Sequence, residues 1–300
     1  MNQLLKSMYH GILRALPAKP ALYLMYFRGY HRVLDLKHPK YYGEKIQWLK
    51  LYGGLEELAD YVDKYKVRAY VDKIIGPGHV ARLIGVYDRA EEIDFDELPQ
   101  QFVAKSTNGT QTVLICRDKP TLDIPKARKT MNAWLDERFD EVKKEPQYKN
   151  VQSRILIEEY LQDDSGELRD YKFYCFDGKP LWYSVFNGRF SNKTVDTYTI
   201  DGQFLPDFQN GGTHAKLSEH PLPKPEQLEE LVACAQALAQ PFTYVRVDLY
   251  LVKGHVYFGE LTFTDGAGCE PMIPLEKYDV EFARRIPLSK VLKQQEENNT

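Results

Sequence analysis

The sequence predicts an α+β protein in which a helical segment precedes two mixed regions. Three observations support this fold class: residues 1–60 carry helical periodicity without a strand signal, short β-runs and helices alternate from residue 82 onward, and residues 243–263 hold two strong β-runs. A length of 300 residues fits two domains at roughly 150 residues each. The predicted division is a helical segment at 1–60, α+β subdomains at 61–152 and 153–290, and a tail at 291–300.

Helical periodicity dominates the first 75 residues. Apolar residues recur three and four positions apart, and Gly76-Pro77-Gly78 ends the last of these helical runs, as glycine and proline do after a helix. From residue 82 the pattern changes to short β-branched and aromatic runs. The first region is expected to hold strands at 83–87, 101–105 and 112–116 and a helix at 127–138.

A polar stretch at 140–150 reads as the connection to the second region. Asp177-Gly178 predicts a hairpin turn between two of the strands in that region. The expected strands are 154–160, 170–176, 181–187, 195–200, 243–252 and 256–263, with a helix at 226–240 that follows a proline-rich loop.

Charge and hydropathy exclude several classes of protein. Forty Lys and Arg residues stand against 43 Asp and Glu residues, and this near balance argues against a dedicated nucleic-acid binder. The longest apolar stretch near the start, residues 22–27, is far shorter than the roughly 20 residues that cross a bilayer. We therefore expect a cytoplasmic protein with no transmembrane segment and no nucleic-acid partner.

Cysteine and histidine chemistry has no support in the sequence. The four cysteines contain no C-x-x-C pair, and the seven histidines form no H-E-x-x-H motif. The thiols are expected to be ordinary buried side chains, and any catalysis must use other groups.

The last two β-runs place charged residues on one face. Arg246 and Asp248 alternate with apolar residues. A three-residue connection at 253–255 would set Asp248 opposite Glu260 and Arg246 opposite Thr262, whereas a two-residue connection would put the two carboxylates on opposite faces. Facing carboxylates beside an arginine suit Mg²⁺ that carries a phosphate. The alternative is that both carboxylates are solvated residues of an exposed sheet.

A polar loop with a central glycine follows the strand that ends at Lys105. It reads Ser106-Thr107-Asn108-Gly109-Thr110 and leads into a second β-run. Its N–H groups can bind phosphates while Lys105 holds a point charge against them. The alternative is an ordinary Asn-Gly hairpin turn.

The segment from Arg154 to Tyr171 resembles a nucleotide hinge. An apolar strand runs into Glu158-Glu159-Tyr160-Leu161, and Asp170 follows after a turn. Backbone groups at such a strand end can bind adenine, and a carboxylate can accept both ribose hydroxyls. The alternative is a charged strand end without a ligand.

These motifs in their order resemble the ATP-grasp superfamily. They are Asp63-Lys64, F-V-A-K with its glycine loop, I-E-E-Y-L with Asp170, V-R-V-D, and F-G-E-L-T. The branch that they resemble is the teichuronopeptide-biosynthesis (TupA-like) ATP-grasp family, through Y-Y-G-E-K-I-Q-W-L-K-L, A-D-Y-V-D-K-Y-K-V-R-A-Y-V, E-E-Y-L and D-Y-K-F-Y-C-F-D-G-K-P. The resemblance spans roughly residues 36–274.

The resemblance implies an ATP-grasp fold, in which two α+β subdomains clasp ATP, and a carboxylate–amine ligase that uses ATP and Mg²⁺ through an acylphosphate. Arg246 and Lys105 would be catalytic, and Asp248, Glu260 and Thr262 would hold the metal. Thr262 stands where these enzymes usually have asparagine, so that a water or Asp265 would complete the metal site. The nucleotide would contact Lys64, Lys105, Ser106, Asn108, Gly109, Thr110, Glu158, Glu159, Tyr160, Leu161, Asp170 and Lys172.

The same resemblance points to a glycan. Members of this branch are associated with bacterial surface polysaccharides, which implies coupling of an amino acid or amine to a uronic-acid carboxylate. Candidate glycan contacts are Tyr183, Asn187 and Arg189, since aromatic faces stack on sugars and arginine pairs with carboxylates. The alternatives are a surface strand without a ligand, a sugar or glycan kinase that uses the same ATP site, and a binding scaffold without turnover.

The helices before residue 60 have two readings. A mixture of basic and aromatic residues could dock them on a membrane or a partner. The other reading is that they pack on the catalytic body. The residues concerned are Lys19, Tyr23, Tyr26, Phe27, Arg28 and Tyr30.

Overall fold

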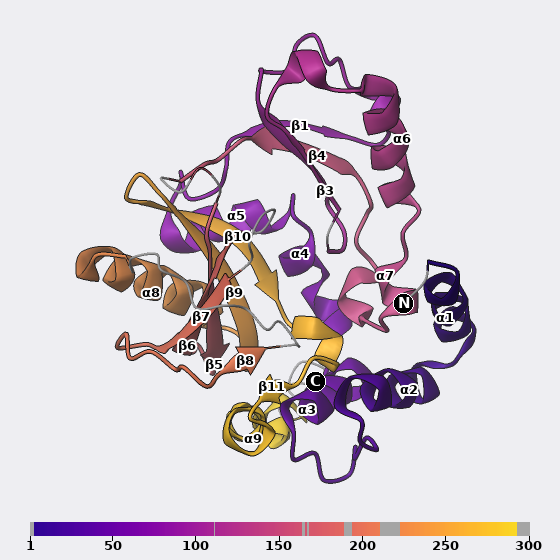
Figure 1. Ribbon diagram of the computed structural model, residues 1–300, viewed down its shortest axis with the longest axis vertical. Coiled ribbons are helices and arrows are strands. Elements are labelled where there is room, and N and C mark those ends of the chain that lie inside the picture. Colours follow the sequence, from indigo (N-terminus) through magenta and orange to yellow (C-terminus); the bar gives the residue numbers. More distant parts are fainter. Residues whose placement is uncertain are drawn as a thin grey trace.

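Two lobes, each a β-sheet with helices packed on it, lie beside a group of N-terminal helices (Figure 1). The computed structural model describes residues 3–110, 112–163, 166, 168–188, 194–210 and 223–292. The predicted α+β class and the helical N-terminal segment are both present.

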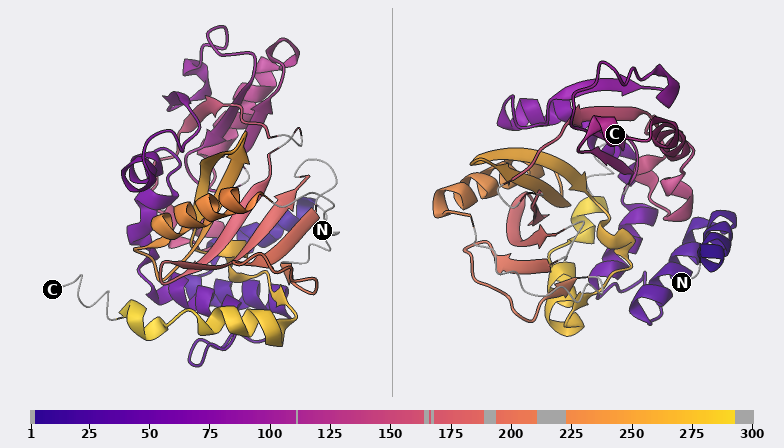
Figure 2. Two further views of the ribbon diagram at one scale, coloured as in Figure 1. Left: turned by 90° about the vertical axis from the view of Figure 1, so that its left-hand side faces the viewer. Right: turned by 45° about the horizontal axis from the view of Figure 1, so that its top comes forward.

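The N-terminal segment forms three helices, α1 (Gln3–Ala15), α2 (Ala18–Tyr30) and α3 (Tyr42–Tyr52). The inward faces of α1 and α2 form one apolar cluster, in which Tyr26 and Tyr30 are buried and stack at 4.4 Å, whereas the buried apolar residues of α3 pack with the second sheet and α9 (Val280–Arg284). α1 lies against α7 (Phe139–Val142), which follows the first lobe's helix at 124–135 (Figures 1 and 2). The helices therefore pack on the body of the protein through one face.

The first lobe is a four-stranded antiparallel sheet in the order β1-β4-β2-β3. Its strands are β1 (Leu83–Tyr87), β2 (Phe102–Ser106), β3 (Val113–Cys116) and β4 (Ile155–Glu159), and α6 (Ile124–Leu135) packs on it. We expected β4 in the second region. It instead pairs with β1 and β2, because its buried residues complete the core beneath α6.

The second lobe is a five-stranded antiparallel sheet in the order β10-β9-β5-β6-β7. The helix α8 (Pro225–Ala239) buries one face of this sheet (Figure 2). The predicted Asp177-Gly178 hairpin joins β5 to β6, with both turn residues at positive φ, 47° and 73°. The strands are β5 (Asp170–Phe176), β6 (Lys179–Asn187), β7 (Thr194–Thr199), β9 (Tyr244–Val252) and β10 (His255–Thr262).

The β9–β10 hairpin differs from the expectation in its turn. Its connection has two residues, Lys253 and Gly254, which alone would put the two carboxylates on opposite faces. A β-bulge at Gly259 adds one residue to β10 and restores the pairing of Asp248 with Glu260. A Cβ atom on Gly259 would lie 2.9 Å from the Asp248 carbonyl oxygen, so that glycine permits the bulge. The predicted pairing is confirmed, but the predicted loop length is wrong.

Short elements connect the lobes and end the chain. α4 and α5 lead from the N-terminal helices to the first lobe, and the C-terminal elements return to α3. They are η1 (Leu55–Leu58), α4 (Ala59–Val62), α5 (Val67–Ile75), η2 (Ala90–Glu92), η3 (Lys119–Thr121), η4 (Pro146–Tyr148), β8 (Gln209–Asn210), η5 (Asp265–Gly268), β11 (Met272–Ile273), η6 (Leu275–Asp279) and α9 (Val280–Arg284).

A buried carboxylate, Asp279, joins the C-terminal segment to the N-terminal helices. It accepts hydrogen bonds from the Tyr30 hydroxyl at 2.8 Å and from the Tyr42 and Met272 backbone N–H groups at 2.7 and 2.9 Å. Burial raises the pKa of Asp279 to about 6, and these hydrogen bonds oppose the shift. The folded protein therefore binds this proton more tightly than the unfolded chain does.

This raised pKa predicts a pH dependence of stability. Between pH 3 and 7 the wild type should lose stability relative to Asp279→Asn as pH rises, by about 3 kcal/mol at 1.36 kcal/mol per pKa unit. The sign follows because ionisation of Asp279 costs more in the folded state than in the unfolded state. Urea unfolding of both proteins at several pH values measures the difference, and a pH-independent difference would contradict it.

Candidate functional site

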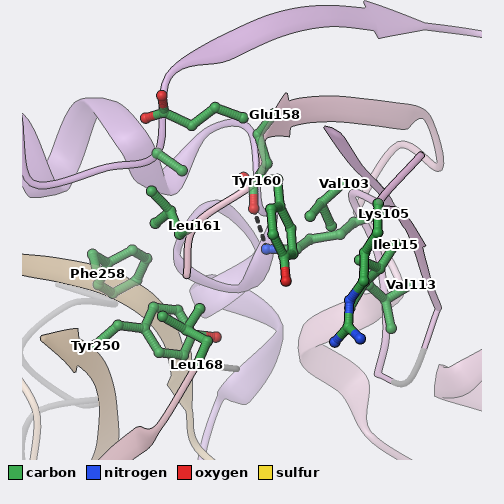
Figure 3. A pocket seen from close by; sticks show the side chains of 13 residues that line it. Val103, Lys105, Val113, Ile115, Glu158, Tyr160, Leu161, Leu168, Tyr250 and Phe258 are labelled. Carbon is green, nitrogen blue, oxygen red and sulfur yellow. Dashed lines mark hydrogen bonds and ion pairs between the residues drawn. The ribbon is translucent and has the colours of Figure 1, made fainter. Parts of the chain in front are cut away.

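Two adjoining cavities lie between the lobes. The first, which we name the base cavity, is walled by the apolar side chains of β2 and β3 on one side and by Tyr250 and Phe258 on the other. Figure 3 shows Tyr160, Leu161 and Leu168 at its edge. The remaining labelled side chains that line it are Val103, Lys105, Val113, Ile115 and Glu158. An apolar slot with polar groups at its edge suits a planar aromatic base.

The expected hinge residues lie at this cavity. Glu158, Glu159, Tyr160 and Leu161 all line it, at the end of β4. Glu158 forms an ion pair with Lys105, drawn as a dashed line in Figure 3. The Glu159 carboxylate accepts a hydrogen bond from the Arg82 N–H at 2.8 Å.

The second cavity, which we name the phosphate cavity, is rich in charge. Lys105, Val113 and Tyr250 line both cavities, so that the two adjoin. Three lysines from separate elements meet here with three carboxylates from the second sheet. Its charged lining residues are Lys64, Lys105, Lys172, Asp170, Asp248 and Glu260. Asp170 is buried, with an oxygen 3.8 Å from the Lys172 ammonium group.

The polar loop between β2 and β3 borders the phosphate cavity and is held in a defined shape. Lys64 donates to the Gly109 carbonyl oxygen at 2.5 Å, and its backbone N–H donates to the Thr107 carbonyl oxygen at 3.0 Å. Ser106 lies inside the loop, where its hydroxyl contacts Thr112 at 2.6 Å and donates to the Asn108 carbonyl oxygen. Ser106 and Asn108 are buried and therefore shape the loop, whereas Thr110 lines the cavity.

Burial also lowers the pKa of Lys64, the residue that holds this loop. The pKa of Lys64 is lowered because its ammonium group is desolvated, and the carboxylate of Glu260 opposes this shift. Lys64 therefore holds the loop through its hydrogen bonds, while the charge of Glu260 favours its protonated form.

Arg246 brings the predicted carboxylates together. Its Nε and Nη2 atoms donate to Asp248 at 2.6 and 2.7 Å, and Nη2 also donates to Glu260 and to the Thr262 hydroxyl, both at 3.1 Å. Burial disfavours the charge on Arg246, but Asp248 and Asp265 outweigh this effect, and the pKa of Arg246 lies well above its ordinary value. The guanidinium group therefore stays charged at the centre of the site.

Three further side chains contact Asp248, Glu260 or Arg246. Lys172 contacts the second oxygen of Asp248, and the Thr262 hydroxyl donates to Glu260 at 3.1 Å. Asp265 contacts Arg246 through the opposite edge of the guanidinium group. Thr262 therefore lies beside the expected metal ligands, and Asp265 orients the arginine.

The candidate glycan residues do not gather at this site. Tyr183 is fully buried and stacks between Phe173 and Tyr198 at centroid distances of 5.4 and 5.2 Å. Its expected contact with a sugar does not fit this place in the core. Asn187 is also buried, and its side-chain amide has no hydrogen-bond partner among the residues that the structure describes. Arg189 lies outside the described residues.

Sequence reasoning missed three residues that support the site. Lys143 donates to the Thr110 hydroxyl at 3.0 Å, while Gln47 and Lys50 of α3 donate to the Ala267 carbonyl oxygen at 3.0 and 2.6 Å. Gln47 and Lys50 lie three residues apart on a buried face of α3. Polar residues at this spacing on an otherwise apolar face were the signal that could have identified them.

Lys105 has a testable role in the cavity. Lys105→Ala should weaken ATP binding about 10- to 100-fold, because a charge-assisted hydrogen bond contributes about 1.5–3 kcal/mol. Nucleotide titration measures this affinity. The control is Lys277→Ala, which removes an exposed lysine that is paired with Asp207 and lines neither cavity. Equal ATP affinity in both variants would contradict a phosphate role for Lys105.

Comparisons with known proteins relate the chain to one family. The family described as TupA-like ATPgrasp matches residues 44–286. No curated protein matches the chain. Similar solved structures include a D-alanine–D-alanine ligase from Bacillus anthracis complexed with ATP, at 17% identity and a TM-score of 0.48, covering 79% of this chain and 68% of the ligase. An L-amino acid ligase from Bacillus licheniformis has 15% identity and a TM-score of 0.44, covering 70% of this chain and 45% of that one.

The family match carries the assignment, since it spans more than half of the chain and includes both lobes and the charged cavity. The fold and the enzyme class expected from the sequence are thereby confirmed. The chain belongs to the TupA-like ATP-grasp family.

Proposed function

We propose that the protein is an ATP- and Mg²⁺-dependent ligase that joins a carboxylate to an amine through an acylphosphate. One observation carries the proposal: Lys64, Lys105 and Lys172 meet Asp248 and Glu260 in one cavity, which adjoins an apolar slot. Phosphoryl transfer needs mainly positioned positive charge around the moving oxygens. The cavity supplies that charge between two lobes.

The residues present fit a magnesium ion. Asp248 and Glu260 accept hydrogen bonds from the same guanidinium nitrogen, at 2.7 and 3.1 Å, and a magnesium ion held by both carboxylates would replace these hydrogen bonds. Within the residues that the structure describes, no group of three or more His, Cys, Asp or Glu side chains could hold a metal. Mg²⁺ in such enzymes is bound by one or two carboxylates, with phosphate oxygens and water as the other ligands. Bound there, it would neutralise charge on the phosphates.

The chain's own residues divide the remaining work. Lys64 and Lys105 are proposed to hold phosphates, and Asp170 the ribose. Arg246 is proposed to stabilise the γ-phosphoryl group during transfer. A substrate carboxylate oxygen bonds to the γ-phosphorus as its bond to the ADP oxygen breaks. An amine then attacks the acyl carbon, phosphate leaves, and the amine loses a proton to solvent. The protein needs no nucleophile of its own.

The substrates that we propose are a uronic-acid carboxylate of a bacterial surface polysaccharide or its precursor, and an amino acid or amine. The reaction would take place in the cytoplasm, where ATP is available. Support for the glycan comes from the family resemblance.

Release of ADP tests the reaction type. Purified protein with ATP and Mg²⁺ should release ADP only when a uronic acid and an amine are both present, across a screen of uronic-acid glycans and the twenty amino acids. ADP release with a sugar alone, leaving a stable phosphate ester, would replace the ligase by a kinase. ATP binding without ADP release under any combination would identify a binding scaffold instead.

A peripheral membrane contact is proposed for the outer face of α1. Leu5, Met8 and Ile12 are more than half exposed on this helix, and residues 1–34 contain five Lys or Arg and no acidic residue. No helix in the described part of the chain has the length and apolar character to cross a bilayer. Sedimentation with anionic vesicles should recover the wild type but not Met8→Ser/Ile12→Ser, and equal recovery would contradict this surface.

A further inference from the structure

A third cavity, of about 640 Å³, lies between the N-terminal helices and the first lobe. We name it the helical cavity. Its walls come from α1, α2, the end of α6, α7 and η5. Pockets of roughly 300–1,000 Å³ hold small-molecule ligands of sugar size or larger. None of the residues assigned to ATP, except Thr110, lines it.

The helical cavity adjoins the phosphate cavity. Thr110 and Thr112 line both, so that the phosphate loop forms a wall shared by the two. A second connection runs through η5, because Asp265 contacts Arg246 while Ala267, two residues later, lines the helical cavity. A ligand held in the helical cavity therefore lies next to the groups that surround the γ-phosphate.

Hydrogen bonds from α3 hold the walls of this cavity in place. Ala267 has a left-handed conformation, with φ 55° and ψ 21°, between Gly266 and Gly268, which also have positive φ. This strained turn is held by Gln47 and by the buried ammonium group of Lys50. Lys50 also donates to the Lys143 carbonyl oxygen at 3.0 Å, which ties η5 to the opposite wall.

The lining chemistry points to a hydroxylated carboxylate. Arg14 contributes a guanidinium group with no ion pair among the described residues, and Lys143 contributes an ammonium group beside the phosphate loop. Tyr9 and Trp134 also line it, but Trp134 is only 7% exposed and the Arg28 guanidinium group lies 4.5 Å over the Tyr9 ring, so these rings contribute apolar wall rather than free faces. Cations bind carboxylates, which makes Arg14 and Lys143 the groups that favour an acidic ligand. The carboxylates of Glu137 and Glu270 add acceptors for hydroxyl groups.

We propose that the helical cavity binds the carboxylate substrate, of the uronic-acid class, and that the N-terminal helices are therefore part of the substrate site. The inference rests on the proposed ligase function. The carboxylate would enter beside Thr110 and Lys143, and Arg14 would bind the distal part of an acidic glycan at the outer rim.

Calorimetric titration with D-glucuronate, at saturating Mg²⁺ and a non-hydrolysable ATP analogue, tests this site without turnover. Arg14→Gln should weaken glucuronate binding about 10-fold, as expected when a charge-assisted hydrogen bond is lost. Val142→Trp, which fills the cavity from α7, should abolish it. The control Lys19→Gln removes an exposed charge of α2 that does not line the cavity.

Unchanged affinity for the ATP analogue in every variant shows that the nucleotide site is intact. Glucuronate binding to both cavity variants with wild-type affinity would overturn the proposal, as would the absence of saturable binding to the wild type. Failure of the ligase reaction looks different: glucuronate would bind in the predicted manner, but ATP with glucuronate and any amine would release no ADP.

Discussion

Asp248→Asn should reduce Mg²⁺-dependent ADP formation by at least about 1,000-fold, because a metal ion contributes several kcal/mol to the stabilisation of transferring phosphates. Asp248 is 1% exposed and contacts both Arg246 and Lys172. Asparagine keeps the shape of the side chain but carries no charge for the cation. A coupled assay of ADP release over a range of Mg²⁺ concentrations measures the effect, and Glu260→Gln should act in the same direction.

The matched control for this variant is Asp279→Asn. Asp279 is equally buried and accepts three hydrogen bonds, but it lies outside both nucleotide cavities. It should keep the wild-type rate at neutral pH. If Asp248→Asn retained the wild-type rate and the wild-type Mg²⁺ dependence, the metal site would be wrongly assigned.

Gly109→Ala should lower the rate and the ATP affinity by about 100-fold. Gly109 has φ 79°, and a Cβ atom there would lie 2.0 Å from the Phe139 ring. Left-handed strain of about 1–2 kcal/mol and overpacking of about 1–3 kcal/mol both oppose the native loop. The loop must then move away from Lys64, which donates to its carbonyl oxygen. Nucleotide titration and ADP release measure the two effects.

Two variants separate the causes. Gly202→Ala has a comparable φ of 87° but meets no atom within 4 Å, so that it should affect stability without changing ATP affinity. Gly109→Ala/Phe139→Leu removes part of the clash and should recover part of the lost affinity. ATP affinity that stays at the wild-type level in Gly109→Ala would show that the loop does not bind phosphate.

Local patterns predicted most of the fold. Alternating apolar residues located the strands, since one face of each sheet packs on helices, and Asp177-Gly178 located a turn whose positive φ angles favour this pair. The membership of β4 in the first sheet was not predictable in this way. Strand order depends on contacts between distant segments, here β4 with β1 and β2.

The site was predictable where one strand pair determines it. The sequence predicted that Arg246 lies beside Asp248 and Glu260, and the three side chains are in contact. Their pairing depends on a β-bulge in β10 that the sequence pattern did not predict. The prediction that Tyr183 contacts a glycan was wrong, because Tyr183 is buried. Alternation of apolar and polar residues along a strand does not show which of its two faces other elements cover. Lys143 was missed since its contact with Thr110 joins residues 33 positions apart through tertiary structure alone.

The proposed binding of ATP and metal between the lobes is tested most directly by a crystal structure of the protein with ADP and Mn²⁺, which gives an anomalous signal. We predict a manganese peak in contact with the carboxylates of both Asp248 and Glu260, with the diphosphate beneath the loop of Gly109. A manganese peak away from both carboxylates, or a nucleotide bound outside the two adjoining cavities, would contradict the account.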